Sequence, residues 1–218
     1  MKMTNRWNRL IYRLWAPIYD STVNLIFLPG RRRALELLNL QAGERVLIIG
    51  VGTGADLPLL PAGVMATGID LSPEMLAKAR LKIQVSRASI ELIEGDAQNL
   101  LVEPASFDAV ILNLILSVIP DANACLKSAF GALKPGGRAV IFDKFLQEGQ
   151  SASPIRKFVN LFSTLLGTDI NRRLSDMMRD CTWLVTCDEP GIAGGMYRVL
   201  LLKKPNDLAS NVIPVSAK

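Results

Sequence analysis

The stretch that decides the fold is VLIIGVGTG, residues 46–54. Its first four residues form a compact apolar run, which is typical of a buried strand. Three glycines at alternate positions follow, and glycine allows positive φ angles and a close approach of the backbone to a ligand. The N-terminus of a helix after such a loop offers free N–H groups to that ligand. The alternative interpretation is a tight strand-to-helix turn without a ligand.

Short apolar runs alternate with helical patterns on the C-terminal side of these glycines. Strands are expected at residues 46–49, 64–69, 90–93, 109–116 and 138–142, with helices at 73–85, 122–133, 155–166 and 171–180. Apolar strands separated by helices predict a parallel sheet covered on both faces, and right-handed crossovers make it a doubly wound α/β sheet. Two late strands, 182–187 and 197–203, are joined by so short a loop that they must be antiparallel.

The chain before the glycines predicts helices. Apolar residues recur at intervals of three and four over residues 6–20, which is typical of an amphipathic helix that Pro17 kinks or ends. A second apolar stretch is expected to close at Pro29-Gly30, before a helix over residues 31–40. We therefore expect a helical N-terminal segment or lid at residues 1–40, the main domain at 41–204 and a flexible tail at 205–218.

The composition excludes several kinds of chemistry. The 218 residues include no histidine, so a Ser-His-Asp triad, a Cys-His pair and a two-histidine zinc site are all excluded. Three cysteines without a C-x-x-C pair favour neither a disulfide framework nor a zinc site. We expect no metal, no secretory signal and no membrane-spanning segment, which together indicate a cytoplasmic protein.

The net charge of +5 is unevenly distributed. Residues 1–33 hold seven basic side chains against Asp20 alone, whereas residues 34–218 hold 18 basic and 19 acidic ones. A nearly neutral body argues against nucleic-acid binding. A basic amphipathic helix with tryptophans instead suits an anionic membrane surface, so an association with the inner face of the membrane is a hypothesis for residues 1–33.

Acidic residues follow the second and third expected strands. Asp70 lies 20 residues after Gly50, where a carboxylate can accept both hydroxyls of a ribose. Asp70 could also cap the next helix, but Ser72 already fills that role. Asp96 ends the third strand and suits the exocyclic amine of an adenine. A nicotinamide dinucleotide site is an alternative, because Gly50, Gly52 and Ala55 satisfy G-x-G-x-x-A.

Further motifs separate these alternatives. Phe107-Asp108-Ala109 opens the fourth strand and LKPGGR, residues 133–138, turns into the fifth. With them the chain resembles the class I S-adenosylmethionine-dependent methyltransferases over residues 44–204. The resemblance implies a Rossmann-like seven-stranded sheet whose last strand is antiparallel, with S-adenosylmethionine as cofactor. It further implies contacts of Gly50, Val51, Gly52 and Gly54 with the methionine moiety, of Asp70 with the ribose, and of Leu71, Met75, Asp96 and Ala97 with the adenine.

One position departs from this family. Ile48 stands two residues before the first glycine, where the family usually has Glu or Asp. The resemblance therefore leaves the partner of the methionine ammonium unassigned. A non-catalytic module that only binds the cofactor is an alternative that Ile48 supports.

A narrower resemblance indicates which kind of molecule accepts the methyl group. WAPIYD (15–20), Arg31-Arg32-Arg33 and LPLLP (57–61) look like the branch that contains bacterial phosphatidylethanolamine N-methyltransferases and the ubiquinone and menaquinone C-methyltransferases. This implies a lipid or lipid-like acceptor, the alternative being a soluble small molecule. It also implies that Tyr19 lies over the cofactor, although a core-packing tyrosine is an equal alternative.

Two polar residues at strand ends complete the candidate catalytic set. Asn113 interrupts the apolar fourth strand, and a buried polar group is costly unless it has a partner, so we expect a role in the site. Asp143 ends the fifth strand, where it touches the acceptor or pairs with Lys144. Tyr19, Asp143 and water are the candidate proton acceptors. Arg172 and Arg173 either bind an anionic headgroup or lie in solvent.

Overall fold

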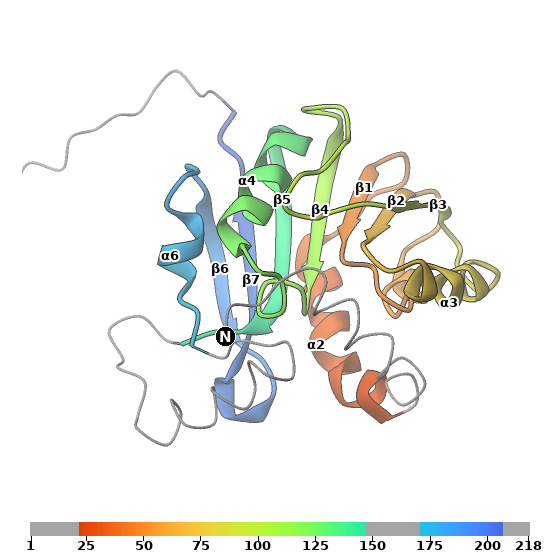
Figure 1. The fold of residues 1–218 in the computed structure, drawn as a ribbon, viewed down its shortest axis with the longest axis horizontal. Coiled ribbons are helices and arrows are strands. Elements are labelled where there is room, and N and C mark those ends of the chain that lie inside the picture. The colour runs from red at the N-terminus through yellow and green to blue at the C-terminus, as the bar shows by residue number, and fades with distance from the viewer. Residues whose placement is uncertain (1–21, 147–170, 207–218) are drawn as a thin grey trace, which may run out of the picture.

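A single seven-stranded sheet organises the molecule (Figure 1). The computed structural model describes residues 22–146 and 171–206. The strands are β1 (Arg45–Ile49), β2 (Met65–Asp70), β3 (Ser89–Glu94), β4 (Phe107–Asn113), β5 (Leu133–Lys144), β6 (Leu184–Pro190) and β7 (Tyr197–Lys203), in the order β3-β2-β1-β4-β5-β7-β6. The helices are α2 (Thr22–Leu38), α3 (Pro73–Ile83), α4 (Ala122–Ala132) and α6 (Leu174–Met178), with short 3-10 turns η1 (Leu57–Leu59) and η2 (Ala193–Gly195).

The directions of the strands confirm the predicted fold class. Neighbours among β1 to β5 pair in parallel, whereas β7 pairs antiparallel with both β5 and β6. The hairpin of β6 and β7 therefore places an antiparallel strand inside a sheet that is otherwise parallel. This is the doubly wound, mostly parallel arrangement with an antiparallel last strand that the apolar runs and the short late loop predict.

Two hydrophobic cores cover the two faces of the sheet. Along β1, Leu47 and Ile49 belong to the core with α4 and α6, while Val46 and Ile48 belong to the core with α2 and α3. Strand β4 alternates in the same way, because successive side chains of a strand point to opposite faces. Asn113 follows Ile111 by two residues and so belongs to the α2 face.

The prediction of a break at Pro29-Gly30 is wrong, because α2 runs through Pro29 without interruption. Gly30, the next residue, lets this part of the helix pack closely on the sheet. A side chain at Gly30 would overlap the ring of Phe142, so the missing Cβ lets α2 lie directly on the sheet. Phe27 also contacts Phe142, with ring centroids 6.1 Å apart. This packing offsets the cost of an interior proline, about 3 kcal/mol.

Several helices and strands begin or end at residues other than those predicted. Strand β4 ends at Asn113 rather than residue 116, because Leu114 has a φ of 61°, which no strand accommodates. The expected helix after the glycine loop is only the 3-10 turn η1, which contains Pro58. The helix expected at 171–180 shortens to α6, β5 begins five residues earlier than expected, and β6 begins two residues later. The helices expected at 6–20 and 155–166 lie outside the described residues, as does the tail from residue 207.

Other expectations concern cysteines and membranes. The three cysteines are free, and burial raises the pKa of the Cys125 thiol to about 12, so this thiol has little thiolate character. Within residues 22–146 and 171–206, no helix combines the length and the hydrophobicity that a membrane span requires.

Candidate active site

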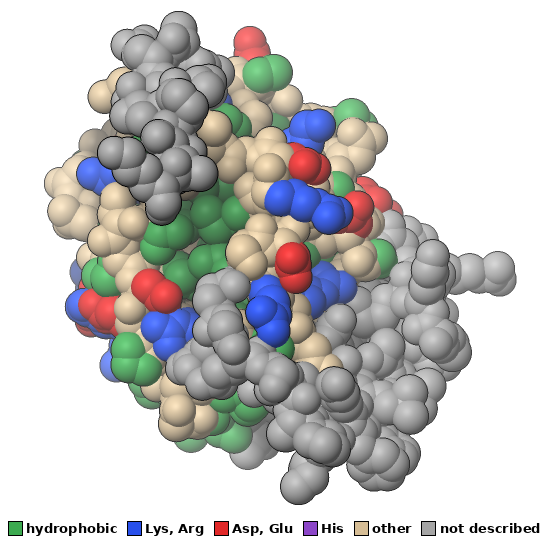
Figure 2. Space-filling view, turned by 90° about the vertical axis from the view of Figure 1, so that its left-hand side faces the viewer, with side chains coloured by type: hydrophobic (Ala, Val, Ile, Leu, Met, Phe, Trp, Pro, Cys, Tyr) green, Lys and Arg blue, Asp and Glu red, His purple; other side chains and the backbone are tan. Residues whose placement is uncertain are grey.

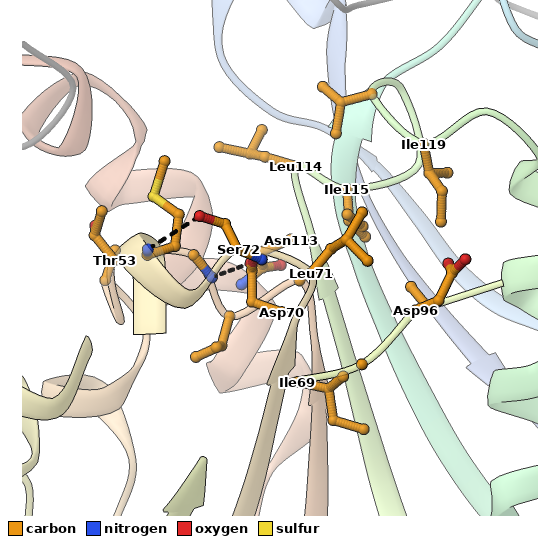
Figure 3. Close-up of a pocket in the computed structure, with 18 of the residues that line it drawn as sticks. Thr53, Ile69, Asp70, Leu71, Ser72, Asp96, Asn113, Leu114, Ile115 and Ile119 are labelled. Atoms are coloured by element: carbon orange, nitrogen blue, oxygen red, sulfur yellow. Dashed lines mark hydrogen bonds between the residues drawn. The ribbon is translucent and has the colours of Figure 1, made fainter. Parts of the chain in front are cut away.

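A pocket at the carboxyl ends of the parallel strands brings together most of the predicted residues (Figure 3). Gly50 and the two residues after it come from the loop after β1, Asp70 and Leu71 from the end of β2, and Met75 from α3. Nine of the predicted residues line this pocket: Gly50, Val51, Gly52, Asp70, Leu71, Met75, Asp96, Ala97 and Asn113. Residues that are 63 positions apart in the sequence therefore meet in one site.

Asp70 holds the glycine loop in place. Its Oδ2 accepts a hydrogen bond from the backbone N of Gly52 at 2.8 Å, and its Oδ1 accepts one from the backbone N of Ser72 at 2.9 Å. Each carboxylate oxygen has a second lone pair, so Asp70 keeps acceptor capacity for a ligand. Ser72 caps α3 by accepting from the N of Met75 at 3.3 Å, as predicted.

The environment of Asp70 favours its neutral form. Burial raises the pKa of this carboxyl above its ordinary value of 3.8, although the N–H groups of Ser72 and Gly52 oppose the shift. A buried carboxylate that gains further donors from a ligand is returned toward its charged form. The hydroxyls of a ribose are donors of this kind.

The glycines of the loop have different roles. Gly50 has a φ of 70°, and a Cβ there would lie 2.7 Å from Cδ1 of Ile115, so the loop after β4 requires glycine at this position. At Gly52 a Cβ would meet only the O of Gly50, at 3.9 Å, which leaves room for a ligand. Gly54 lies outside the pocket lining, where a Cβ would meet Leu57 and the backbone of Ala79.

The polar groups of the site form a row across the carboxyl ends of the parallel strands. Asp96 follows β3, Asp70 ends β2, Gly50 follows β1 and Asn113 ends β4, and these four strands are consecutive neighbours. The row therefore extends over three inter-strand spacings, or about 14 Å. Asp96 accepts hydrogen bonds from the backbone N and from Nε2 of Gln98, which fix its carboxylate at one end of the row.

At the other end of the row lies a buried polar cluster that sequence reasoning missed. Asp56 is 2% exposed and accepts from Arg31 Nη1 at 2.7 Å and from Asn113 Nδ2 at 2.9 Å. Arg31 and Asn113 both line the pocket. The sequence carries two signals for Arg31: it belongs to the Arg31-Arg32-Arg33 motif, and it shares a helical stripe with the buried Ala34 and Leu38. Nothing local indicates its pairing with Asp56, 25 residues later.

The wall opposite the acidic residues is apolar. It is built from the loop after β4, and Figure 3 shows Leu114, Ile115 and Ile119 on this side; the full set is Leu114, Ile115, Val118, Ile119 and Pro120. Arg172 fixes this loop by donating to the carbonyls of Leu116 and Ile119. Arg172 therefore has a structural role, and the geometry does not support the predicted binding of an anionic headgroup by this residue.

Two of the predicted catalytic residues, Asp143 and Tyr19, are not part of the described pocket lining. Asp143 is fully buried and is not a lining residue; its Oδ2 accepts from the N of Ser117 and its Oδ1 from the N of Lys144. Burial raises the pKa of Asp143. Asp143 therefore has a structural role, in which it holds the loop after β4. Tyr19 lies outside the described residues.

The geometry suits an extended nucleoside joined to a short polar chain. Carboxylates at two strand ends accept hydroxyl and amine protons, a glycine loop admits a close ligand, and an apolar wall excludes water. Among the described residues no cluster of acidic or cysteine side chains could hold a metal ion.

Comparisons with known proteins show which family of proteins this chain resembles. A family model described as a methyltransferase domain matches residues 47–141. A phosphatidylethanolamine N-methyltransferase of Cereibacter sphaeroides is 31% identical over 195 residues, covering 88% of this chain and 95% of the relative. A demethylmenaquinone methyltransferase of Tropheryma whipplei is 37% identical over 140 residues, covering 61% of this chain and 57% of the relative.

Solved structures share the fold at lower identity. The putative methyltransferase in a complex with the Haloferax volcanii Trm112 activator has a TM-score of 0.72 at 19% identity, covering 90% of this chain and 97% of that one. A putative methyltransferase of Bacillus halodurans has a TM-score of 0.69 at 16% identity, covering 80% and 98%. These similarities show that the sheet and its covering helices form a methyltransferase-type fold.

Proposed function

Because the chain belongs to the class I S-adenosylmethionine-dependent methyltransferases, we propose that its acceptor is a lipid or lipid-like molecule, with the amine of a phosphatidylethanolamine-type headgroup favoured. The observation that carries this proposal is the extent of one similarity. The Cereibacter sphaeroides phosphatidylethanolamine N-methyltransferase matches over 95% of its own length and 88% of this chain. The matches of quinone methyltransferases are shorter, covering 57% of the Tropheryma whipplei enzyme and 70% of the demethylmenaquinone methyltransferase of Lactobacillus johnsonii.

Quinone methylation is the second candidate. The Tropheryma whipplei relative has the higher identity, 37%, and a chloroplast naphthoquinone methyltransferase of Arabidopsis thaliana is 33% identical over 157 residues. The apolar wall of Ile115, Val118 and Ile119 is compatible with either acceptor. Membership in the family argues against the third candidate, a module without catalytic activity.

The residues of the pocket fit the cofactor that the family implies. Asp70 would accept from the ribose hydroxyls, Asp96 would accept from the adenine amine, and Gly52 leaves space beside the loop. When bound, S-adenosylmethionine supplies a methyl group that its sulfonium already activates. The protein then needs chiefly to position the acceptor and exclude water, which explains why a chain without histidine can support the reaction.

An ammonium headgroup must lose a proton before it accepts a methyl group. The buried bonds of Asp143 to Ser117 and Lys144 argue against Asp143 as the proton acceptor. We therefore favour Tyr19 or water for this role. We further propose that the protein associates with the inner face of the membrane, because residues 1–21 hold four basic side chains against one acidic one.

One experiment tests both acceptors. The full chain is incubated with S-adenosylmethionine that carries a labelled methyl group, first with phosphatidylethanolamine vesicles and separately with a demethylated menaquinone, and the products are analysed by mass spectrometry. We expect label on the headgroup nitrogen. Label on the quinone ring alone would favour the second candidate. Asp70→Ala is the control, and it should remove labelling of either acceptor.

A further inference from the structure

Two buried polar atoms beside the glycine loop have no hydrogen-bond partner. They are Nε of Arg31 and Oδ1 of Asn113, and both residues line the pocket. Buried polar atoms in proteins are nearly always satisfied, so an unsatisfied pair at a pocket wall indicates a ligand that supplies the partners. One atom is a donor and the other an acceptor, which already limits the ligand.

The orientation of Asn113 follows from its neighbour. The carboxylate of Asp56 can only accept, so Asn113 must present its NH₂ group to Asp56 and its carbonyl oxygen elsewhere. Arg31 approaches the other oxygen of Asp56 through Nη1, which leaves Nε directed to a different partner. Asp56 thus orients both side chains while its own two oxygens are occupied.

We infer that Arg31 and Asn113, oriented by Asp56, form the subsite for the amino-acid end of the cofactor. This inference rests on the proposed S-adenosylmethionine-dependent function. The amino-acid end is a zwitterion: its carboxylate accepts from Nε of Arg31, and its ammonium donates to Oδ1 of Asn113. A guanidinium and an amide carbonyl provide one partner for each charge.

The position of the subsite agrees with this assignment. Asp96 and Asp70 occupy the β3 and β2 end of the row, while Asn113 lies beyond Gly50 at the β4 end. A nucleoside at Asp70 and Asp96 therefore directs its other end toward Asn113 and Arg31.

The same contacts explain how the chain functions with Ile48. Ile48 is 1% exposed and packs in the core of the α2 face, the face to which Asn113 also belongs. A carboxylate at position 48 would be placed among apolar groups, whereas Asp56, in the loop after β1, bonds to two residues of the pocket lining. The polar partners that the family usually has near position 48 are supplied instead by α2 and β4.

Calorimetric titration of the full chain with two ligands tests the inference. S-adenosylhomocysteine carries the amino-acid end, and 5′-methylthioadenosine lacks it. For Arg31→Met and for Asn113→Ala we expect the dissociation constant of S-adenosylhomocysteine to rise about 10- to 100-fold, since each loses a hydrogen bond to a charged group. The constant for 5′-methylthioadenosine should change less than about twofold, because the nucleoside end is untouched.

Arg33→Met is the matched control. Arg33 lies two residues further along α2 but pairs with Glu189 on the surface, with Nη2 2.8 Å from Oε1, so both dissociation constants should stay unchanged. Binding of 5′-methylthioadenosine also shows that each variant is folded. If Arg31→Met does not fold, the methyl ester of S-adenosylhomocysteine tests the same contact in the unaltered protein, and it should bind more weakly than the parent compound.

The outcomes separate this inference from the proposed function. A wild-type protein that binds neither ligand would overturn the cofactor assignment and the inference together. Equal affinity of the wild type for both ligands would overturn the subsite alone, as would equal weakening of both by Arg31→Met. An unchanged affinity for S-adenosylhomocysteine in both variants, with a raised KM for the lipid, would assign the cluster to the headgroup of the acceptor instead.

Discussion

Asp70 combines a structural and a binding task in one side chain. It fixes the glycine loop through the N of Gly52 and its own turn through the N of Ser72, and it keeps lone pairs for a ligand. Burial raises its pKa, so the protein stabilises the charged form less than water does. A carboxylate in this state responds strongly to hydroxyl donors, because they restore the hydrogen bonds that burial removes.

This state predicts how cofactor binding depends on pH. Below the raised pKa, Asp70 is protonated and loses acceptor capacity, so the affinity for S-adenosylhomocysteine should fall as the pH decreases, starting above the ordinary value of 3.8. Titration calorimetry between about pH 4 and pH 8 measures this. Asp70→Asn should bind more weakly and show a flatter profile. Parallel profiles for the two proteins would assign the pH dependence to another group.

At the scale of elements, the site depends on α2 and on the loop after β4. Helix α2 brings Arg31 to the pocket, and its contact with the sheet depends on Gly30 beside Phe142. Asp143 holds the loop after β4 through the N of Ser117, and Arg172 holds it through the carbonyl of Leu116. These contacts keep the apolar wall opposite Asp70 in one position.

The contact at Gly30 predicts opposite effects for two helical glycines. Gly30→Ala places a methyl group into the ring of Phe142, so the free energy of unfolding should fall by about 1–3 kcal/mol. Gly131→Ala is the matched control in α4, where a Cβ meets nothing within 4 Å, and it should gain up to about 1 kcal/mol from helix propensity. Denaturant unfolding of the three proteins measures both changes. A loss of similar size in both variants would contradict the close packing of α2.

The elements also show what the sequence predicts and what it does not. Periodicity is a local property, so the alternating strands and helices and the late antiparallel pair follow from it. The continuation of α2 through Pro29 does not follow from periodicity, because the contact that stabilises it comes from Phe142, more than a hundred residues later. The site divides in the same way: Asp70 and Asp96 follow from their strand ends, whereas the pairing of Arg31 with Asp56 exists only in three dimensions.

At the scale of the whole molecule, the structure changes the charge argument. The basic excess of residues 1–33 includes Arg31, which is buried with Asp56, and Arg33, which pairs with Glu189 and holds the pKa of that carboxyl at about 2. These two cations are engaged within the protein. The charge available for a membrane is therefore that of the exposed Arg32 and of the four basic residues of positions 1–21.

Among the exposed apolar side chains are two pairs of consecutive residues, one at the start of α2 and one on β6. Leu25 and Ile26 are 70% and 59% exposed at the start of α2, directly after the basic segment. Leu184 and Val185 are about half exposed on the edge strand β6, and Figure 2 shows hydrophobic side chains gathered among charged ones on the face beside β6 and α6. Of these two pairs, the first directly follows the basic residues of positions 1–21 in the sequence, which favours it for contact with an anionic bilayer.

Co-sedimentation with anionic liposomes distinguishes the two places. Removal of residues 1–21 keeps α2 and its packing on Phe142, and it should shift the protein to the supernatant, since each basic residue near a bilayer contributes on the order of 1 kcal/mol. Rising salt should weaken binding of the full chain for the same reason. Serine in place of Leu25 and Ile26 should reduce binding, whereas serine in place of Leu184 and Val185 should not. Equal recovery of the full and shortened chains in the supernatant would show that the basic segment does not bind the bilayer.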